Sequence, residues 1–108
     1  MVAPQPTDIE RAVAALTREF GATEVWLFGS AATGVATEHS DIDLLVVRPA
    51  RANSPRPSVE ARLCLSRAGL RRPFDLLVLT PERWQEARRR PTGVYEEIVN
   101  HGVPLHEG

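Results

Sequence analysis

The chain has 108 residues, of which 43% are hydrophobic and 25% are charged, proportions typical of a soluble globular protein and not of a disordered or fibrous one. This length favours a single domain with one core, which we place over residues 1–108. The 13 basic residues are all arginine and are interspersed with 14 acidic residues, giving a formal net charge of −1. Such a balance excludes a general electrostatic attraction to duplex nucleic acid, and we expect no direct nucleic-acid binding.

Cys64 is the only cysteine, which excludes a disulfide framework and a cysteine zinc site, and favours a reducing compartment. Its predicted place on a helix indicates a small, buried apolar residue. The sequence shows no signal pattern, and the apolar runs at residues 44–47 and 76–79 are too short to span a bilayer. We therefore expect no membrane association and a cytoplasmic location.

The first predicted elements are a helix, a strand and a short helical turn. Residues 7–10 have the Thr-x-x-Glu form of a capping box, and apolar residues then follow at helical spacing. This helix is predicted to end at Gly21, because glycine is the usual residue just beyond a helix end. Residues 24–28 are predicted as the first strand and residues 31–34 as a helical turn or loop.

The second predicted strand, residues 41–47, is apolar on both faces beyond Asp43. A strand of that kind belongs in the centre of a sheet that helices cover on both sides. It is followed by residues 48–57, which contain three prolines and several polar residues, so no regular element is expected there. We predict that this proline- and arginine-rich loop is the mobile segment of the domain.

The remaining predicted elements are three helices and two strands. A helix is predicted from Ser58 to about residue 65, and a third strand over residues 74–79. Thr80, with proline and glutamate after it, is a typical helix start, and a last helix covers residues 92–100 before an edge strand at 103–105. The apolar residues that we expect on the buried sides of these helices are Val59, Leu63, Trp84, Val94 and Ile98.

Strands separated by helical patterns predict an α/β (α+β) fold, with a mixed sheet of about four strands flanked by helices. Gly29 and Ser30 stand where the first strand passes into a turn, and backbone N–H groups at such a place are free to meet phosphate. Asp41 and Asp43 occupy alternate positions of the second strand, so they project from one face, close enough to share divalent cations.

Asp75 opens the third strand much as Asp41 opens the second, so pairing of these strands would bring a third carboxylate to the first two. Three acids beside a phosphate-binding turn are the arrangement that two-metal phosphoryl or nucleotidyl transfer requires. Each feature also has a simpler interpretation. Asp41 and Asp43 suit a solvated strand start after a turn, and Asp75 suits a salt-bridged strand end.

Two further clusters of polar residues have mainly structural interpretations. The run Arg88-Arg89-Arg90 suits the C-terminus of a helix electrostatically, which favours a solvent-facing cluster over a contact with a partner protein or RNA. His39 lies beside the candidate metal strand, and a lone loop histidine is more often solvated than bound to a nucleotide.

The chain carries Leu27-Phe28-Gly29-Ser30 and, after ten residues, Asp41-Ile42-Asp43-Leu44. This arrangement resembles the signature of the DNA polymerase β-type nucleotidyltransferase superfamily. The small size resembles the minimal nucleotidyltransferase group, many of whose members are antitoxins paired with HEPN-domain toxins. The resemblance extends from residue 24 to about residue 105 and includes the strand that carries Asp75. It implies the single-domain polymerase β-type nucleotidyltransferase fold.

The resemblance also implies roles for the candidate residues. Gly29 and Ser30 would hold the β- and γ-phosphates of ATP, and Asp41, Asp43 and Asp75 would bind two Mg²⁺ ions. Asp75 would in addition orient or deprotonate the attacking hydroxyl. In the resembling antitoxins this hydroxyl belongs to a tyrosine of the partner toxin, so the implied activity is transfer of AMP from ATP to a HEPN toxin.

Members of the minimal group often carry arginines where Ala31 and Thr33 stand here. Without them the triphosphate would be held less tightly, unless Arg48, Arg51 or another arginine reaches in. This departure keeps open an antitoxin that neutralises its partner by binding alone. A small-molecule nucleotidyltransferase of the aminoglycoside type is a further alternative, although so small a domain leaves little room for a dedicated acceptor pocket.

Overall fold

A computed structural model of the chain describes residues 7–34 and 41–107. Its framework is a mixed sheet, which within these residues has four strands in the order β3-β2-β1-β4. Strand β2 pairs antiparallel with β1 and parallel with β3, and β4 adds antiparallel to the other edge of β1. The strands are β1 (Glu24–Phe28), β2 (Ile42–Val47), β3 (Phe74–Leu79) and β4 (Val103–Glu107). The predicted mixed sheet and terminal edge strand are confirmed.

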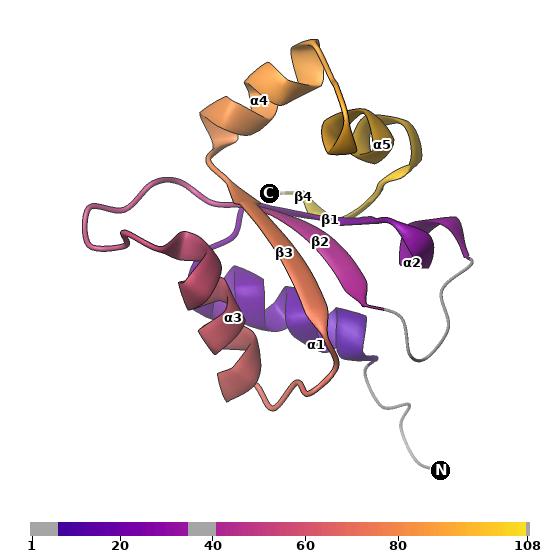
Figure 1. The fold of residues 1–108 in the computed structure, drawn as a ribbon. Helices are drawn as coiled ribbons and strands as arrows, with labels where there is room; N and C mark the ends of the chain where they lie inside the picture. Colours follow the sequence, from indigo (N-terminus) through magenta and orange to yellow (C-terminus); the bar gives the residue numbers. More distant parts are fainter. Residues whose placement is uncertain (1–6, 35–40, 108) are drawn as a thin grey trace.

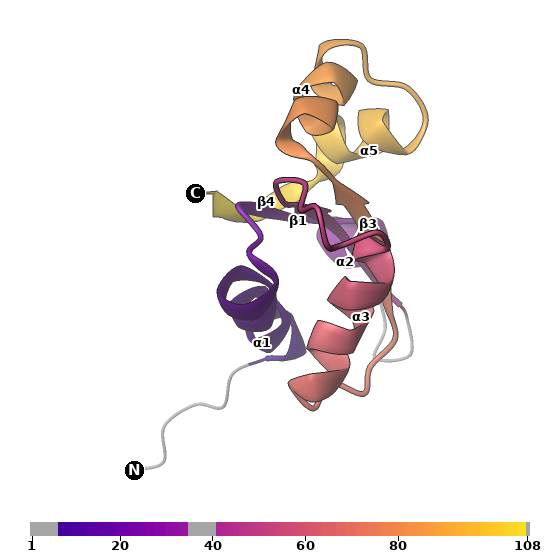
Figure 2. The same cartoon turned by 90° about the vertical axis from the view of Figure 1, so that its left-hand side faces the viewer.

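Helices cover both faces of this sheet (Figures 1 and 2). The first helix, its π-helical last turn η1 and helix α3 lie on one face, and α4 and α5 lie on the other. None of the helices in the described ranges is long and apolar enough to cross a membrane. The helical elements are α1 (Asp8–Ala15), η1 (Leu16–Phe20), α2 (Ser30–Thr33), α3 (Pro57–Arg67), α4 (Pro81–Arg89) and α5 (Val94–His101).

The start and end of the first helix follow from its sequence. The Thr7 hydroxyl accepts a hydrogen bond from the Glu10 N–H at 3.1 Å, while the Glu10 carboxylate accepts one from the Thr7 N–H at 3.4 Å. This is the predicted capping box. Gly21, with φ of 82°, ends the helix in the left-handed conformation and donates its N–H to the Leu16 carbonyl. That bond spans five residues, which makes the last turn a π-helix, a feature not predicted.

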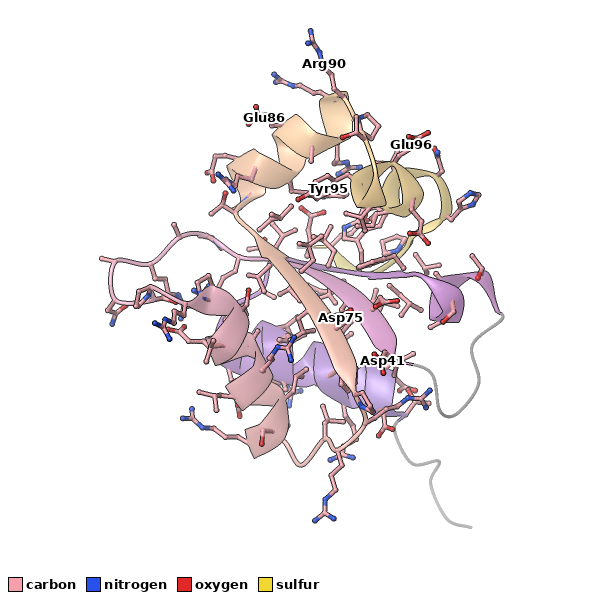
Figure 3. All side chains as sticks on the ribbon, viewed as in Figure 1. Asp41, Asp75, Glu86, Arg90, Tyr95 and Glu96 are labelled. Atoms are coloured by element: carbon pink, nitrogen blue, oxygen red, sulfur yellow. The ribbon has the colours of Figure 1, made fainter. Side chains whose placement is uncertain are left out.

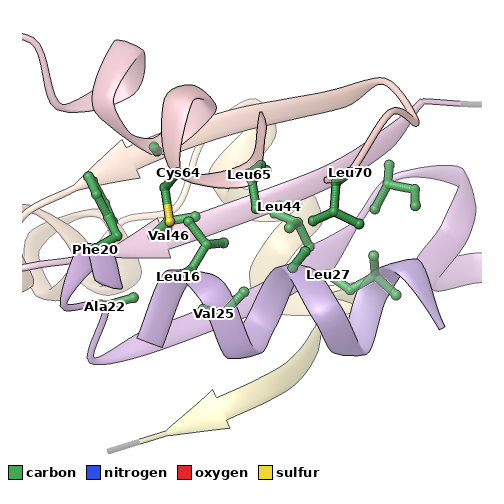
Figure 4. Packing of buried hydrophobic residues seen from close by; sticks show 13 residues of the cluster. Leu16, Phe20, Ala22, Val25, Leu27, Leu44, Val46, Cys64, Leu65 and Leu70 are labelled. Atoms are coloured by element: carbon green, nitrogen blue, oxygen red, sulfur yellow. The ribbon is translucent and has the colours of Figure 1, made fainter. Parts of the chain in front are cut away.

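One core lies between the sheet and the layer formed by α1, η1 and α3 (Figure 4). Leu44 and Val46 of β2 face this core, whereas Leu45 and Val47 face the opposite one, and all four are fully buried. The predicted central position of this strand is therefore confirmed. Cys64 packs in the first core with 6% of its surface exposed, as expected.

The buried face of α3 differs from the predicted one. Val59 and Leu63 are each 48% exposed, and the residues that pack on the sheet are instead Ala61, Cys64 and Leu65. The helix carries two apolar stripes, and packing selects the one with small residues, which lets it approach the sheet closely. The inward placement of Val94 is also wrong: it is the first residue of α5 and is 39% exposed.

The second core lies between the sheet and the helices α4 and α5, and it contains both tryptophans. Trp26 of β1 and Trp84 of α4 meet edge to face, with ring centroids 5.8 Å apart. The guanidinium of Arg88 lies over both rings, at 5.4 and 5.3 Å from their centroids. Ile98 of α5 completes this packing with no exposed surface, so the expected burial of Trp84 and Ile98 is confirmed.

Residues 48–57 are tied to the fold at Arg48, which is only 4% exposed. Its guanidinium lies 4.0 Å from the ring centroid of Phe20 and donates hydrogen bonds to Ser54 Oγ at 2.6 Å and Glu60 Oε2 at 3.3 Å. Ser54 Oγ donates to the same carboxylate at 2.6 Å. This hydrogen bond, followed by Arg48, lowers the pKa of Glu60 from its ordinary value. The mobility of the loop stays a prediction.

The substitution Arg48→Ala removes the cation–π contact and two hydrogen bonds, so we expect a loss of about 2 kcal/mol in the free energy of unfolding. Urea unfolding followed by circular dichroism measures it. Arg51→Ala, the same change at an exposed position of the loop, is the control and should cost far less. Equal losses for both variants would show that the Arg48 cluster does not hold the loop.

Candidate functional site

The candidate site lies where β2 and β3 begin. These strands pair parallel with Asp43 opposite Asp75, so adjacent strands hold the two carboxylates about 5 Å apart at the backbone. Asp41 precedes β2 by one residue and shares a face with Asp43. The predicted strand pairing is confirmed, although Asp75 stands opposite Asp43 and not Asp41.

The Gly29 turn lies against the Asp43 carboxylate. Phe28, the last residue of β1, pairs with Asp43, which brings the following residue against the Asp43 side chain. Gly29 has φ of 71° and ψ of −153°, a conformation open in practice to glycine alone. A Cβ at this position would overlap the Asp43 carboxylate. Glycine is therefore required here both by the backbone and by the neighbouring acid.

Ser30 begins α2 directly after this turn, next to the acids. The first N–H groups of a helix have no partner within the helix, so they remain available to a bound anion. Helix α2 has no basic residue, as the presence of Ala31 and Thr33 already indicated. Any positive charge for a triphosphate must come from elsewhere.

Carboxylates crowd Asp43, and one of them was not expected. Burial raises the pKa of Asp43, and the negative charges of Asp75, Asp41 and Glu97 raise it further. Glu97 belongs to the first turn of α5, where the helix dipole alone is enough to explain an acidic residue. Its position near Asp43 depends on how α5 packs over β1, so the local sequence carries no signal for it.

Within residues 7–34 and 41–107, no three histidine, cysteine, aspartate or glutamate side chains are gathered tightly enough to hold one metal ion. The donor set nevertheless fits magnesium in its chemistry, because Mg²⁺ prefers carboxylate oxygens and its charge would relieve the repulsion around Asp43. Asp41 and Asp75 are exposed, so their side chains can turn toward a cation without disturbing the core.

Asp41 and Asp75 also border a groove with a volume of about 370 Å³. Its other wall is formed by the second half of α3, including Arg62 and Ser66, and by the segment that leads into β3. Since β3 is an edge strand among the described residues, this groove opens to the outside of the sheet. It borders Asp41 and Asp75 from the side of the first core, and Asp43 is not among its lining residues.

Neither Arg48 nor Arg51 supplies the cation missing from α2. Arg48 follows the last residue of β2, five residues from Asp43, a distance of about 16 Å along a strand. It is also engaged by Ser54, Glu60 and Phe20 as described above. The Arg51 guanidinium lies beside Gly21, again at the far end of the strand. His39, for which we favour a solvated side chain over a nucleotide contact, lies outside the described residues.

The sequence model of the nucleotidyltransferase domain family matches residues 9–105. Because this match covers almost the whole chain, the protein belongs to the nucleotidyltransferase domain family. A search of curated proteins found no match to the chain.

Two solved structures share the fold. A structure described as a toxin–antitoxin with AMP-PNP is 20% identical, with a TM-score of 0.59, and the match covers 95% of this chain and 75% of that one. A mutant MntA-HpeT toxin–antitoxin is 24% identical, with a TM-score of 0.57, and the match covers 96% and 75%. At these identities the likeness concerns the fold, and it confirms the predicted nucleotidyltransferase architecture.

The substitution Gly29→Ala should destabilise the protein by about 1–3 kcal/mol, because alanine is strained in this conformation. It should also displace the Asp43 carboxylate, which can be followed through the carboxyl ¹³C chemical shift of Asp43. Gly34→Ala is the matched control, because Gly34 has φ of 80° and open space around it. The control should lose stability and leave the Asp43 signal in place; an unchanged signal in both variants would disprove the contact.

The substitution Asp43→Asn should raise the melting temperature at neutral pH in the absence of divalent cations. The pKa of Asp43 is raised above its ordinary value of 3.8, so its ionised form opposes folding. The stability associated with this group is therefore present below pH 3.8 and falls as the pH rises through the raised pKa. The advantage of the variant should vanish in acid.

Thermal unfolding of both proteins across this pH range provides the measurement. Asp8→Asn is the control, since Asp8 stands in the first turn of α1 and its charge favours the helix. It should lower the melting temperature. A lower melting temperature for Asp43→Asn at neutral pH would show that Asp43 is not under electrostatic strain.

Proposed function

We propose that this protein is a Mg²⁺-dependent nucleotidyltransferase that moves AMP from ATP onto a hydroxyl of a partner protein. The partner is a HEPN-domain toxin, the acceptor is one of its tyrosines, and the protein acts as the antitoxin. The observation that carries this proposal is the in-register pairing of Asp43 with Asp75 beside the Gly29 turn. The family and the toxin–antitoxin neighbours support it.

In this proposal the turn binds the phosphates of the nucleotide, and the acids bind the metal ion. The N–H groups and hydroxyl at Gly29 and Ser30 hold the β- and γ-phosphates. Asp41, Asp43 and Asp75 hold Mg²⁺, which when bound neutralises the triphosphate and the departing pyrophosphate. The AMP-PNP in one structural neighbour supports the choice of an adenine nucleotide.

Asp75 is placed to act on the acceptor, because it borders both Asp43 and the groove beside α3. Its carboxylate takes the proton of the acceptor hydroxyl, the hydroxyl oxygen bonds to the α-phosphorus, and the bond to pyrophosphate breaks. The groove, of about 370 Å³, is open and not enclosed. Such a shape suits a hydroxyl carried by another polypeptide more than an enclosed small molecule.

A second candidate is an antitoxin that neutralises its partner by binding alone. Two observations favour it: α2 carries no cation for the triphosphate, and in the described part of the chain the acids are not gathered around one point. Both candidates share the fold and the partner. They differ in whether the carboxylates are needed.

The test is incubation of the chain with labelled ATP, Mg²⁺ and the protein encoded by the adjacent gene. For the enzyme, Asp41→Asn combined with Asp43→Asn should lower label transfer by at least about 100-fold, because metal-site substitutions typically have effects of that size. Asp8→Asn, an amide exchange on α1, should leave transfer unchanged. Inhibition of the partner that survives the double substitution, without label transfer, would establish the binding antitoxin.

A further inference from the structure

A second groove, with a volume of about 600 Å³, lies between α4 and α5 on the face of the sheet that carries the second core. It begins at Leu79, the last residue of β3, about 13 Å along the strand from Asp75. Figure 3 shows Tyr95 between the two helices, and Asp41 and Asp75 toward the start of β3. The groove is therefore separate from the candidate site, although both border one strand.

The groove exists because α4 directs different residues toward the sheet and toward α5. Trp84 turns to the sheet and is fully buried, with Arg88 over its ring. Arg83, Ala87 and Arg90, spaced by four and three residues, line the groove instead. Close helix packing requires interlocking apolar side chains, and two long cationic side chains do not supply it. The space between α4 and α5 therefore remains open.

The groove combines an apolar floor with a cationic rim. Leu79, Ala87 and Tyr95 are partly buried and form the floor. The rim arginines are exposed, and no ion pair engages them within residues 7–34 and 41–107. The rim consists of Arg83, Arg89 and Arg90, opposed by Glu86 alone. On a chain with a net charge of −1, three unpaired arginines around one groove are a local concentration of positive charge.

We propose that the α4–α5 groove docks an acidic amphipathic helix of the partner protein. Apolar side chains of that helix rest on the floor, and its glutamates or aspartates meet the rim arginines. This inference rests on the partner in the proposed function, but not on catalysis. It assigns the arginine run a contact role at Arg89 and Arg90, whereas Arg88 packs on the tryptophans.

An acidic peptide fits this groove better than RNA does. RNA binding without a large positive surface relies on exposed aromatic rings on which bases stack. Tyr95 is instead half-buried and packed with the second core, so it does not offer an exposed ring for base stacking. Apolar side chains on the floor beside exposed arginines match the two kinds of side chain on an amphipathic helix.

The test uses the full chain and a fluorescein-labelled 16-residue helical peptide as the probe, with leucines along one face and glutamates beside them. Fluorescence anisotropy, without nucleotide or Mg²⁺, should show saturable binding that weakens as salt is added. Arg83→Glu combined with Arg90→Glu should weaken binding by at least about ten-fold, because two attractions become repulsions.

The matched control is Arg18→Glu combined with Arg67→Glu, an equal charge change at exposed positions of the opposite layer, and it should leave the affinity unchanged. A second peptide with glutamine in place of glutamate should bind at least about ten-fold more weakly. Circular dichroism checks that each variant is folded. If the glutamate variant is unfolded, the binding measurement is made instead with Arg83→Gln combined with Arg90→Gln.

Four results would each overturn the proposal. These are the absence of saturable binding, equal affinity for the glutamine peptide, an equal effect of the control substitutions, and tighter binding of oligouridine than of the peptide through the same arginines. The last would assign the groove to RNA. Because the assay contains no nucleotide, loss of label transfer in the Asp41→Asn and Asp43→Asn protein with peptide binding retained would test catalysis separately from docking.

Discussion

The parallel pairing of β2 with β3 is the constraint on which the candidate site depends. It sets Asp43 beside Asp75 on a partly covered face of the sheet, where burial and like charges raise the pKa of Asp43. The arrangement is electrostatically unfavourable, and the fold sustains it through the apolar remainder of the same strand. Residues 44–47 are fully buried between two cores, so burial of these residues holds the strand in place despite the repulsion around Asp43.

Features that depend on a few neighbouring residues could be predicted from the sequence. Short stretches of sequence determine several confirmed features. These are the bounds of β1 and β3, the capping box at Thr7 and the start of α4 after Thr80. The candidate acids were found for the same reason, since the spacing of Asp41 and Asp43 after the Gly29 turn is a local pattern. Their roles in chemistry remain a proposal.

Features that depend on packing between distant elements could not be predicted in this way. Val59 and Leu63 face outward because α3 turns Ala61, Cys64 and Leu65 into the first core. Glu97 approaches Asp43 only because α5 packs over β1. The π-helical turn before Gly21 likewise depends on packing, because Leu16 and Phe20 of this turn are buried in the core. Its sequence alone predicts an ordinary last turn of an α-helix.

The sheet separates charge along the direction of β2 and β3. Their first residues carry the acids of the candidate site, whereas their ends lead to Arg48 and, through the turn at Thr80, to Arg83. With a net charge close to zero, this separation rather than the total charge governs long-range orientation of a partner. For a protein that brings an acidic helix to the arginine end, complementary charge favours one orientation over its reverse.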